Sequence, residues 1–80
     1  MRGQSHSIPP ALFRQLKRVP KGRRRAIYEA LQRTLANEEF FRIHARKGRG
    51  RLFSVALPHG YRVIVYVGKD GERELLRLVA

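Results

Sequence analysis

The sequence contains no cysteine, few acidic residues and no long apolar segment. Without cysteine, the chain can form neither a disulfide nor a thiolate metal site, and it has no thiol nucleophile. No segment approaches the ~20 apolar residues of a membrane-spanning helix. The first ten residues also lack the apolar core of a signal peptide. These absences predict a cytoplasmic protein that does not enter a membrane.

The 80 residues are enough for one small domain, 1–80, because domains typically contain ~100–150 residues. A hydrophobic content of 42% suffices for a globular core and is too high for a disordered basic tail. The three histidines are far apart and lack the i, i+4 spacing of a helical metal site, so no metal or cofactor is expected.

Positive charge dominates the composition, with 18 Lys and Arg residues against six Asp and Glu residues and a net charge of +12. Positions 1–51 hold fourteen basic and three acidic residues, whereas positions 52–80 hold four and three. The electrostatic field of such a positive chain attracts polyanions. Nucleic acid is therefore the first partner to consider, followed by an acidic protein and then a membrane surface. Arginine predominates, and its planar guanidinium suits phosphates, although GC-rich codon usage also raises arginine content.

The N-terminal half has helical spacing. Apolar residues recur every three to four positions over 9–37. Pro20 interrupts the pattern, because proline disfavours helix at the preceding residue and suits the first turn of a new helix. Ser7 is a candidate N-cap. The pattern predicts two helices, over 9–18 and 21–37, that form a hairpin.

The C-terminal half changes to the alternation of strands, separated by turn-forming residues. This pattern predicts strands over 51–57, 61–67 and 72–79. The segment 40–43 is a short strand or a bridge, and 3–7 is a weak candidate for an edge strand. The predicted fold is α+β, with the N-terminal helical hairpin packed on one face of a small twisted antiparallel sheet of three to four strands.

The order of these parts resembles the RelE/ParE superfamily of toxins from type II toxin–antitoxin systems. The similarity spans about 8–79. It is carried by the basic hairpin over 16–35, the loop Arg46–Arg51, and the Gly60–Ile64 segment that begins a central strand. The resemblance implies a RelE-like fold with a concave, positive sheet face.

Membership of this superfamily also implies an acidic cognate antitoxin as partner. In the RelE branch the toxin is an mRNA interferase, an endoribonuclease that inhibits translation by cleaving messenger RNA on the ribosome. In the ParE branch the toxin inhibits DNA gyrase. The sequence departs from RelE-type nucleases in two respects, since the strand over 52–57 has no basic residue and only Ala80 follows the last strand.

Cleavage of RNA by its 2′-hydroxyl requires a base, a cation that stabilises the phosphorane-like charge, and an acid. Arg62 matches the family's strand arginine, which in the RelE branch binds phosphate and stabilises the transition state. From the residues alone, Arg62 is either an anion-binding side chain or a surface side chain paired with Glu74. His44, beside two arginines that favour its neutral form, and His59, in a turn, are the candidate acid and base.

Further residues are candidates for nucleic-acid binding. The glycines of the 46–51 loop let its backbone approach phosphates, while its cations pair with them. A run of three arginines begins the second helix, where positive charge opposes the helix dipole and indicates an external anion. Tyr28 and Tyr66 are the aromatics most suited to base stacking. The candidate set is Arg42, Arg46, Lys47, Arg49, Arg51, Arg23, Arg24, Arg25 and Tyr66.

Three functions remain open from the sequence: a RelE-like nuclease with an incomplete catalytic set, a ParE-like gyrase inhibitor without nuclease activity, and a non-catalytic module that binds RNA or the ribosome.

Overall fold

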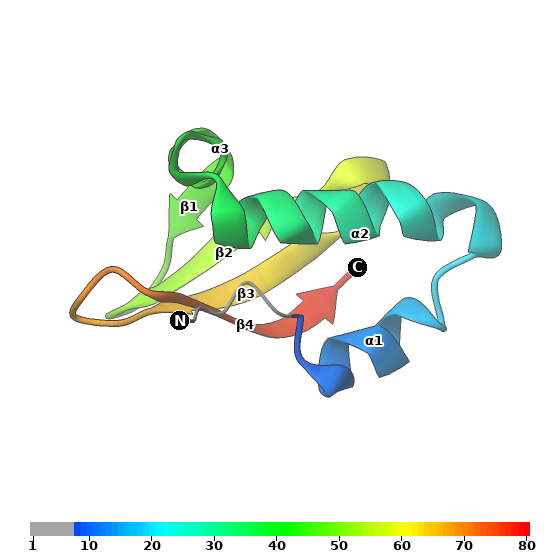
Figure 1. Cartoon of the computed structure of the whole chain (residues 1–80), viewed down its shortest axis with the longest axis horizontal. Coiled ribbons are helices and arrows are strands. Elements are labelled where there is room, and N and C mark those ends of the chain that lie inside the picture. Colours follow the sequence, from blue (N-terminus) through cyan, green and yellow to red (C-terminus); the bar gives the residue numbers. More distant parts are fainter. Residues whose placement is uncertain (1–7) are drawn as a thin grey trace.

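The computed structural model describes residues 8–80, in which three α-helices accompany a four-stranded antiparallel sheet (Figure 1). The elements are α1 (Pro10–Leu16), α2 (Lys21–Ala36), α3 (Glu38–His44), β1 (Ala45–Lys47), β2 (Leu52–Ala56), β3 (Arg62–Val67) and β4 (Arg73–Val79). The sheet order is β1-β2-β3-β4, and a short 3-10 turn, Pro58–Gly60, joins β2 to β3. The α+β class and the antiparallel sheet agree with the prediction. The candidate N-cap Ser7 and the candidate edge strand at 3–7 lie outside the described residues.

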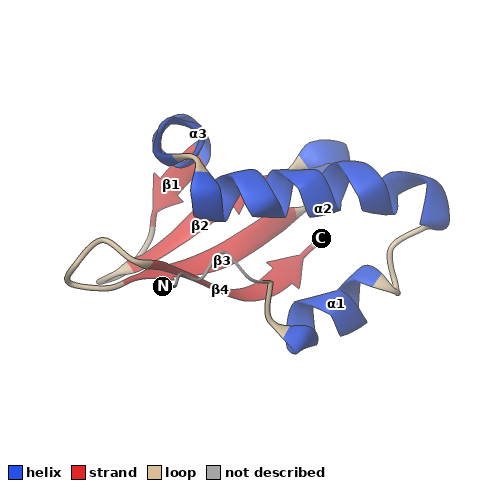
Figure 2. Ribbon diagram, in the orientation of Figure 1, coloured by secondary structure: helices blue, strands red, loops and turns tan. Residues whose placement is uncertain are grey.

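A single core joins α1, α2 and one face of the sheet (Figure 2). Helical spacing directs Leu12 from α1 and Leu31 from α2 inward, and both side chains are fully buried. The strands contribute Val55 and Val63 to the same cluster, because side chains at alternate positions share one face of a sheet. The other face of the sheet has no helix against it among residues 8–80. It is referred to below as the open face.

Helix α1 ends at Leu16, two residues before the predicted end at 18. The backbone N–H groups of Arg18 and Val19 donate to the carbonyls three residues earlier, at distances of 3.0 Å. Such bonds tighten the last turn, and Pro20 prevents the helix from continuing. Val19 is nevertheless buried, so the predicted apolar stripe is retained in the turn.

The prediction of a strand or bridge at 40–43 is wrong, because this segment lies within α3. The Asn37 side chain accepts a hydrogen bond from the N–H of Phe40 at 2.8 Å, which caps the helix. Glu38 and Glu39 follow in the first turn, where negative charge favours the helix dipole. The chain then enters β1 at once, so the expected loop over 46–51 is shorter and its first two residues belong to a strand.

Strand β4 contains an irregularity that the alternating pattern does not reveal. Val65 pairs with Leu75, whereas Ile64 pairs with Arg77, so Leu76 is an extra residue opposite β3. This bulge places Leu75 and Leu78, three positions apart, on the buried face. It also turns Arg77 toward the open face.

Gln15 fastens α1 to the edge strand β4. Its Nε2 donates to the carbonyl of Leu78 at 3.1 Å, and its Oε1 accepts from the N–H of Leu78 at 2.8 Å. The side-chain amide thus takes the place of a neighbouring strand at this point and covers part of an otherwise open sheet edge.

Within the described part of the chain, none of the helices has the length and apolar composition needed to cross a membrane.

Candidate nucleic-acid interface

The open face is defined by the pairing of the strands. Residues directly opposite one another in an antiparallel sheet project from the same face, and their neighbours in sequence project from the other. The registers place these residues on the open face: Arg46, Leu52, Ser54, Ala56, Arg62, Ile64, Tyr66, Glu74, Arg77 and Val79. Their neighbours Val55, Val63 and Val65 are fully buried in the core, which confirms the assignment.

Three rows cross the open face. The central row runs through all four strands, from Arg46 through Ser54 and Ile64 to Arg77. With neighbouring strands about 4.8 Å apart, the backbone positions of its two arginines are separated by roughly 14 Å. Small and apolar side chains occupy the space between the two cations. This row therefore forms a shallow surface with positive charge at each end.

Arg62 lies in the row next to the central one, between Ala56 on β2 and Val79 on β4. Its side chain is half-buried, and its Nε donates a 2.6 Å hydrogen bond to Oγ of Ser54. The register overturns the alternative in which Arg62 pairs with Glu74, because Glu74 lies opposite Tyr66. No other side-chain hydrogen bond or ion pair of Arg62 forms within residues 8–80. The Ser54 contact fixes the guanidinium while leaving its terminal nitrogens for an anion.

The open face is basic although β2 has no basic residue. Arg46 from β1 and Arg77 from β4 flank Arg62, and Glu74 is the one acidic residue in the three rows. Ser54 and Ala56 on β2 are small, so they leave the cations accessible. Sequence reasoning missed Arg77, because the bulge at Leu76 shifts the alternation along β4. The spacing of Leu75 and Leu78 was the available signal, since residues three positions apart in a regular strand project from opposite faces and cannot both be buried in one core.

The predicted basic loop is divided by the fold. Arg46 reaches the open face, whereas Lys47 pairs with Phe53 and belongs to the other face. Arg49 and Arg51 are exposed in the β1–β2 turn, where Gly50 has a φ of 55° that favours glycine. Arg42 is on α3, and its Nη2 lies 3.6 Å from Oε2 of Glu39. Only part of the loop therefore adjoins the open face.

The three arginines at the start of α2 also differ from one another. Arg24 donates from Nε to the carbonyl of Val19 at 2.8 Å and from Nη2 to that of Lys17 at 2.7 Å. It thereby secures the connection between α1 and α2. Arg25 forms an exposed ion pair with Glu29 at 3.4 Å, and Arg23 is exposed.

The two candidate histidines lie at the same end of the sheet as Arg62, but neither forms a hydrogen bond with it among the described residues. His44 ends α3, with Nδ1 3.0 Å from the carbonyl oxygen of Phe40 and its ring stacked on the Phe40 ring at 4.2 Å. His59 is exposed in the β2–β3 turn, three positions before Arg62. Its φ of 64° is left-handed, and Gly60 follows with a φ of 81°, which together reverse the chain.

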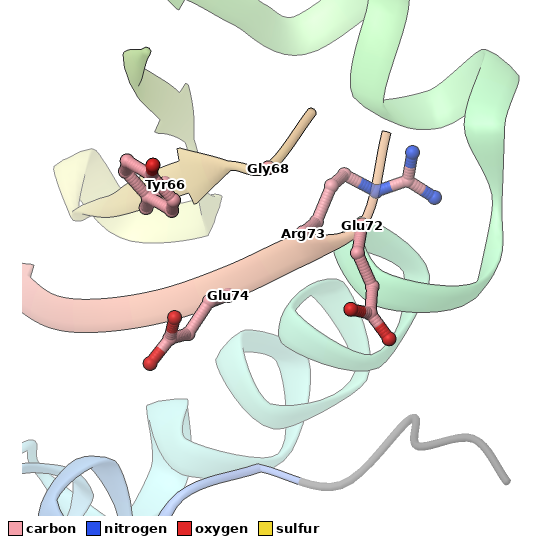
Figure 3. A pocket seen from close by; sticks show the side chains of 5 residues that line it. All are labelled: Tyr66, Gly68, Glu72, Arg73 and Glu74. Atoms are coloured by element: carbon pink, nitrogen blue, oxygen red, sulfur yellow. The ribbon is translucent and has the colours of Figure 1, made fainter. Parts of the chain in front are cut away.

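Tyr66 is 41% exposed and lies on the open face directly opposite Glu74. Figure 3 shows both side chains at the edge of a pocket of about 260 Å³, with Glu72 and Arg73 on its border. Tyr28, by contrast, is on α2, where its hydroxyl accepts from Nε2 of Gln32 at 3.0 Å. Tyr66 is therefore the tyrosine that adjoins the basic surface.

Arg73 is an arginine that sequence reasoning did not single out. Its Nε donates to the carbonyl of Thr34 at 2.7 Å and its Nη2 to that of Leu35 at 3.0 Å. Its guanidinium also lies 5.1 Å from the centre of the Phe41 ring. The carbonyls at the end of a helix lack partners within the helix, so Arg73 caps α2 from a distant strand.

The part of the chain from residue 8 onward contains no group of three His, Asp or Glu side chains that could hold a metal ion. Comparison with protein-family models, curated proteins and solved structures finds no match to this chain.

Proposed function

We propose that this protein is a RelE-like toxin that binds messenger RNA on the ribosome through the open face and cleaves it. The observation that carries the proposal is Arg62, held by Ser54 at 2.6 Å on a sheet face that no described helix covers. Arg46 and Arg77 add two further cations to the same face. The cleavage activity is inferred from the chain's resemblance to the RelE branch of the RelE/ParE superfamily.

The geometry suits a single strand of RNA. The central row offers two arginines at its ends, with the uncharged side chains of Ser54 and Ile64 between them, so an RNA backbone can lie across the strands. Contacts to three phosphates predict that the logarithm of the binding constant falls with the logarithm of salt concentration with a slope of about −2. Arg49 and Arg51 in the adjoining turn steepen this slope if they also reach the RNA.

In the proposed reaction, a base takes the proton of the 2′-hydroxyl, whose oxygen attacks the adjacent phosphorus to form a 2′,3′-cyclic phosphate. The P–O5′ bond breaks, and an acid gives a proton to the leaving 5′-oxygen. Arg62 stabilises the negative charge that develops on the phosphoryl oxygens. Of the two candidate histidines, His59 is nearer to Arg62 in the sequence. Its side chain is exposed, so it suits proton transfer. His44 fits this role less well, because its Nδ1 already contacts the carbonyl of Phe40.

Primer extension on a translated messenger RNA tests the proposal. Wild-type protein is expected to produce ribosome-dependent cleavage, and Arg62→Met is expected to lose at least about 90% of it, since a transition-state charge contact contributes about tenfold or more. Arg33→Met removes one charge from the exposed face of α2 and serves as the matched control. Cleavage that is absent from wild type, or equal in wild type and Arg62→Met, rejects the nuclease function.

A second candidate is a ParE-like inhibitor of DNA gyrase without nuclease chemistry. It is favoured by the lack of a hydrogen bond between Arg62 and either histidine in the described residues. A supercoiling assay with purified protein separates the candidates, because unaffected gyrase removes the second one.

The proposed partner is an acidic antitoxin that neutralises the basic surface. Growth arrest upon expression, relieved by a small acidic protein encoded nearby, is the expected result. A non-catalytic RNA- or ribosome-binding module would instead bind with strong salt dependence and leave growth unaffected.

A further inference from the structure

Glu74 is an unexpected residue on the open face, because a carboxylate repels the phosphates that the neighbouring arginines attract. Within residues 8–80 no cationic nitrogen lies within ion-pair distance of it. It is exposed on β4, and its cross-strand neighbour is an aromatic residue and not a cation. Its carboxylate is therefore open to solvent and accessible to a ligand.

The position of Tyr66 suggests what that ligand is. Directly opposed residues in an antiparallel pair have Cβ atoms about 4.5–5.5 Å apart, and Tyr66 and Glu74 both line one pocket. The pocket there, about 260 Å³, is open to solvent beside the β3–β4 turn, and Gly68, Glu72 and Arg73 complete its lining (Figure 3). An aromatic face beside a hydrogen-bond acceptor matches the way proteins hold an unstacked RNA base.

Arg73, on the border of the same pocket, extends toward the helices and is occupied by the carbonyls of Thr34 and Leu35 (Figure 3). It is not free to neutralise Glu74. The Glu74 carboxylate is thus an acceptor alone, since an ionised carboxylate has no hydrogen to donate, whereas the Tyr66 hydroxyl can donate and accept.

We infer that Tyr66 and Glu74 select guanine, with Tyr66 stacking on the base and Glu74 accepting hydrogen bonds from its N1–H and N2–H groups. Guanine presents these two donors side by side, as a carboxylate requires, whereas adenine presents one amino group beside an acceptor. Tyr66 lies two residues, about 7 Å along β3, from Ile64 in the central row, so the sugar–phosphate of the same nucleotide falls within reach of Arg77 at the end of that row.

This inference rests on the proposed RNA binding and adds base selection to it. The test is fluorescence anisotropy with labelled uridine octamers that carry guanosine, inosine, adenosine or uridine at one central position. Wild-type protein is expected to bind the guanosine oligonucleotide about tenfold more tightly than the adenosine one, as a bidentate contact allows. Inosine lacks the N2 amino group, so its affinity should be intermediate.

Glu74→Gln should abolish the preference for guanosine while binding to the all-uridine octamer stays equal or becomes stronger. Glu72→Gln removes the same charge from the same pocket border and should keep the preference. Tyr66→Leu should weaken binding of all four oligonucleotides about fivefold or more, because stacking does not depend on the base. Circular dichroism of each variant establishes that the fold is retained.

Equal affinity of wild-type protein for all four oligonucleotides, with weaker binding by Arg62→Met, overturns the inference and leaves RNA binding standing. Retention of the preference in Glu74→Gln, or its loss in Glu72→Gln, overturns the assignment to Glu74. Failure of every oligonucleotide to bind overturns RNA binding and base selection together.

Discussion

Arginines on the two faces of the same sheet have opposite surroundings. On the buried face, Arg73 donates to two helix-end carbonyls and lies beside the Phe41 ring. On the open face, Arg62 has one neutral hydrogen-bond partner in the described part of the chain, Ser54. Both guanidiniums are half-buried, so exposure does not distinguish them. The difference lies in which hydrogen-bond acceptors the fold brings to them.

The same contrast separates adjacent residues in α2. Arg24 holds the carbonyls of Lys17 and Val19, whereas Arg25 lies in solvent beside Glu29. A count of basic residues therefore overestimates the charge that is available to a polyanion. Arginines with carbonyl partners contribute to stability, and those without them are the candidates for binding.

The largest expected effect is on stability, at Arg73. Arg73→Met keeps much of the aliphatic bulk but removes two charge-assisted hydrogen bonds and leaves carbonyls of α2 without partners. We expect a loss of about 2 kcal/mol in the free energy of unfolding, which for a domain of this size lowers Tm by roughly 10 °C. Thermal and urea denaturation measure the change. Arg77→Met, on the open face, is the control, and equal destabilisation by both variants would contradict the comparison.

The next largest effect is on binding, at Arg62. Arg62→Met should lower affinity for single-stranded RNA about tenfold, equivalent to about 1.4 kcal/mol, and should reduce the magnitude of the salt slope by about 0.7. Stability should fall by about 0.5 kcal/mol, since one hydrogen bond to a neutral hydroxyl is lost. Anisotropy titrations at several salt concentrations provide both values. Unchanged affinity together with a large drop in Tm would place Arg62 with Arg73 as a structural residue.

Arg24 should give a smaller loss of stability than Arg73. Arg24→Met removes hydrogen bonds of 2.8 and 2.7 Å to the α1–α2 connection, but water can replace the lost partners at this more accessible site. We expect a loss of about 1 kcal/mol, measured by urea denaturation. If Arg24→Met lowered the free energy of unfolding as much as Arg73→Met, access of water to the unpaired carbonyls would not reduce the destabilisation.

The smallest effect is expected at Arg25. Its ion pair with Glu29 is exposed, and such i, i+4 pairs contribute about 0.3–0.5 kcal/mol. Arg25→Met should therefore change stability by a few tenths of a kcal/mol, and salt should remove the difference. A destabilisation above about 1 kcal/mol, unaffected by salt, would contradict the distinction between Arg24 and Arg25.

Sequence patterns predicted the longer elements well. The three-to-four spacing over 21–37 corresponds to α2, and the alternating run over 61–67 corresponds to β3. These patterns succeed because one face of each element must be buried, which repeats apolar residues with the period of the backbone. Helix α3 was missed because Phe40 and Phe41 favour strands, although Asn37 followed by two glutamates was a capping signal.

The candidate site was predicted in part. Arg62, Arg46 and Tyr66 do project from the open face. Arg77 and Glu74 were not in the predicted site, because their place depends on the bulge and on pairing with β3. Local alternation cannot specify such pairing.

The sequence by itself determined the strong positive charge, the longer helices and strands, and the core positions of α2 and β3, since each depends on composition or on spacing within one element. Only the tertiary structure decided which arginines are engaged and which are available. The reason is that a guanidinium is satisfied by acceptors from distant parts of the chain. Arg73 meets the carbonyl of Thr34, 39 positions earlier, whereas within residues 8–80 the side chain of Arg62 meets only the hydroxyl of Ser54.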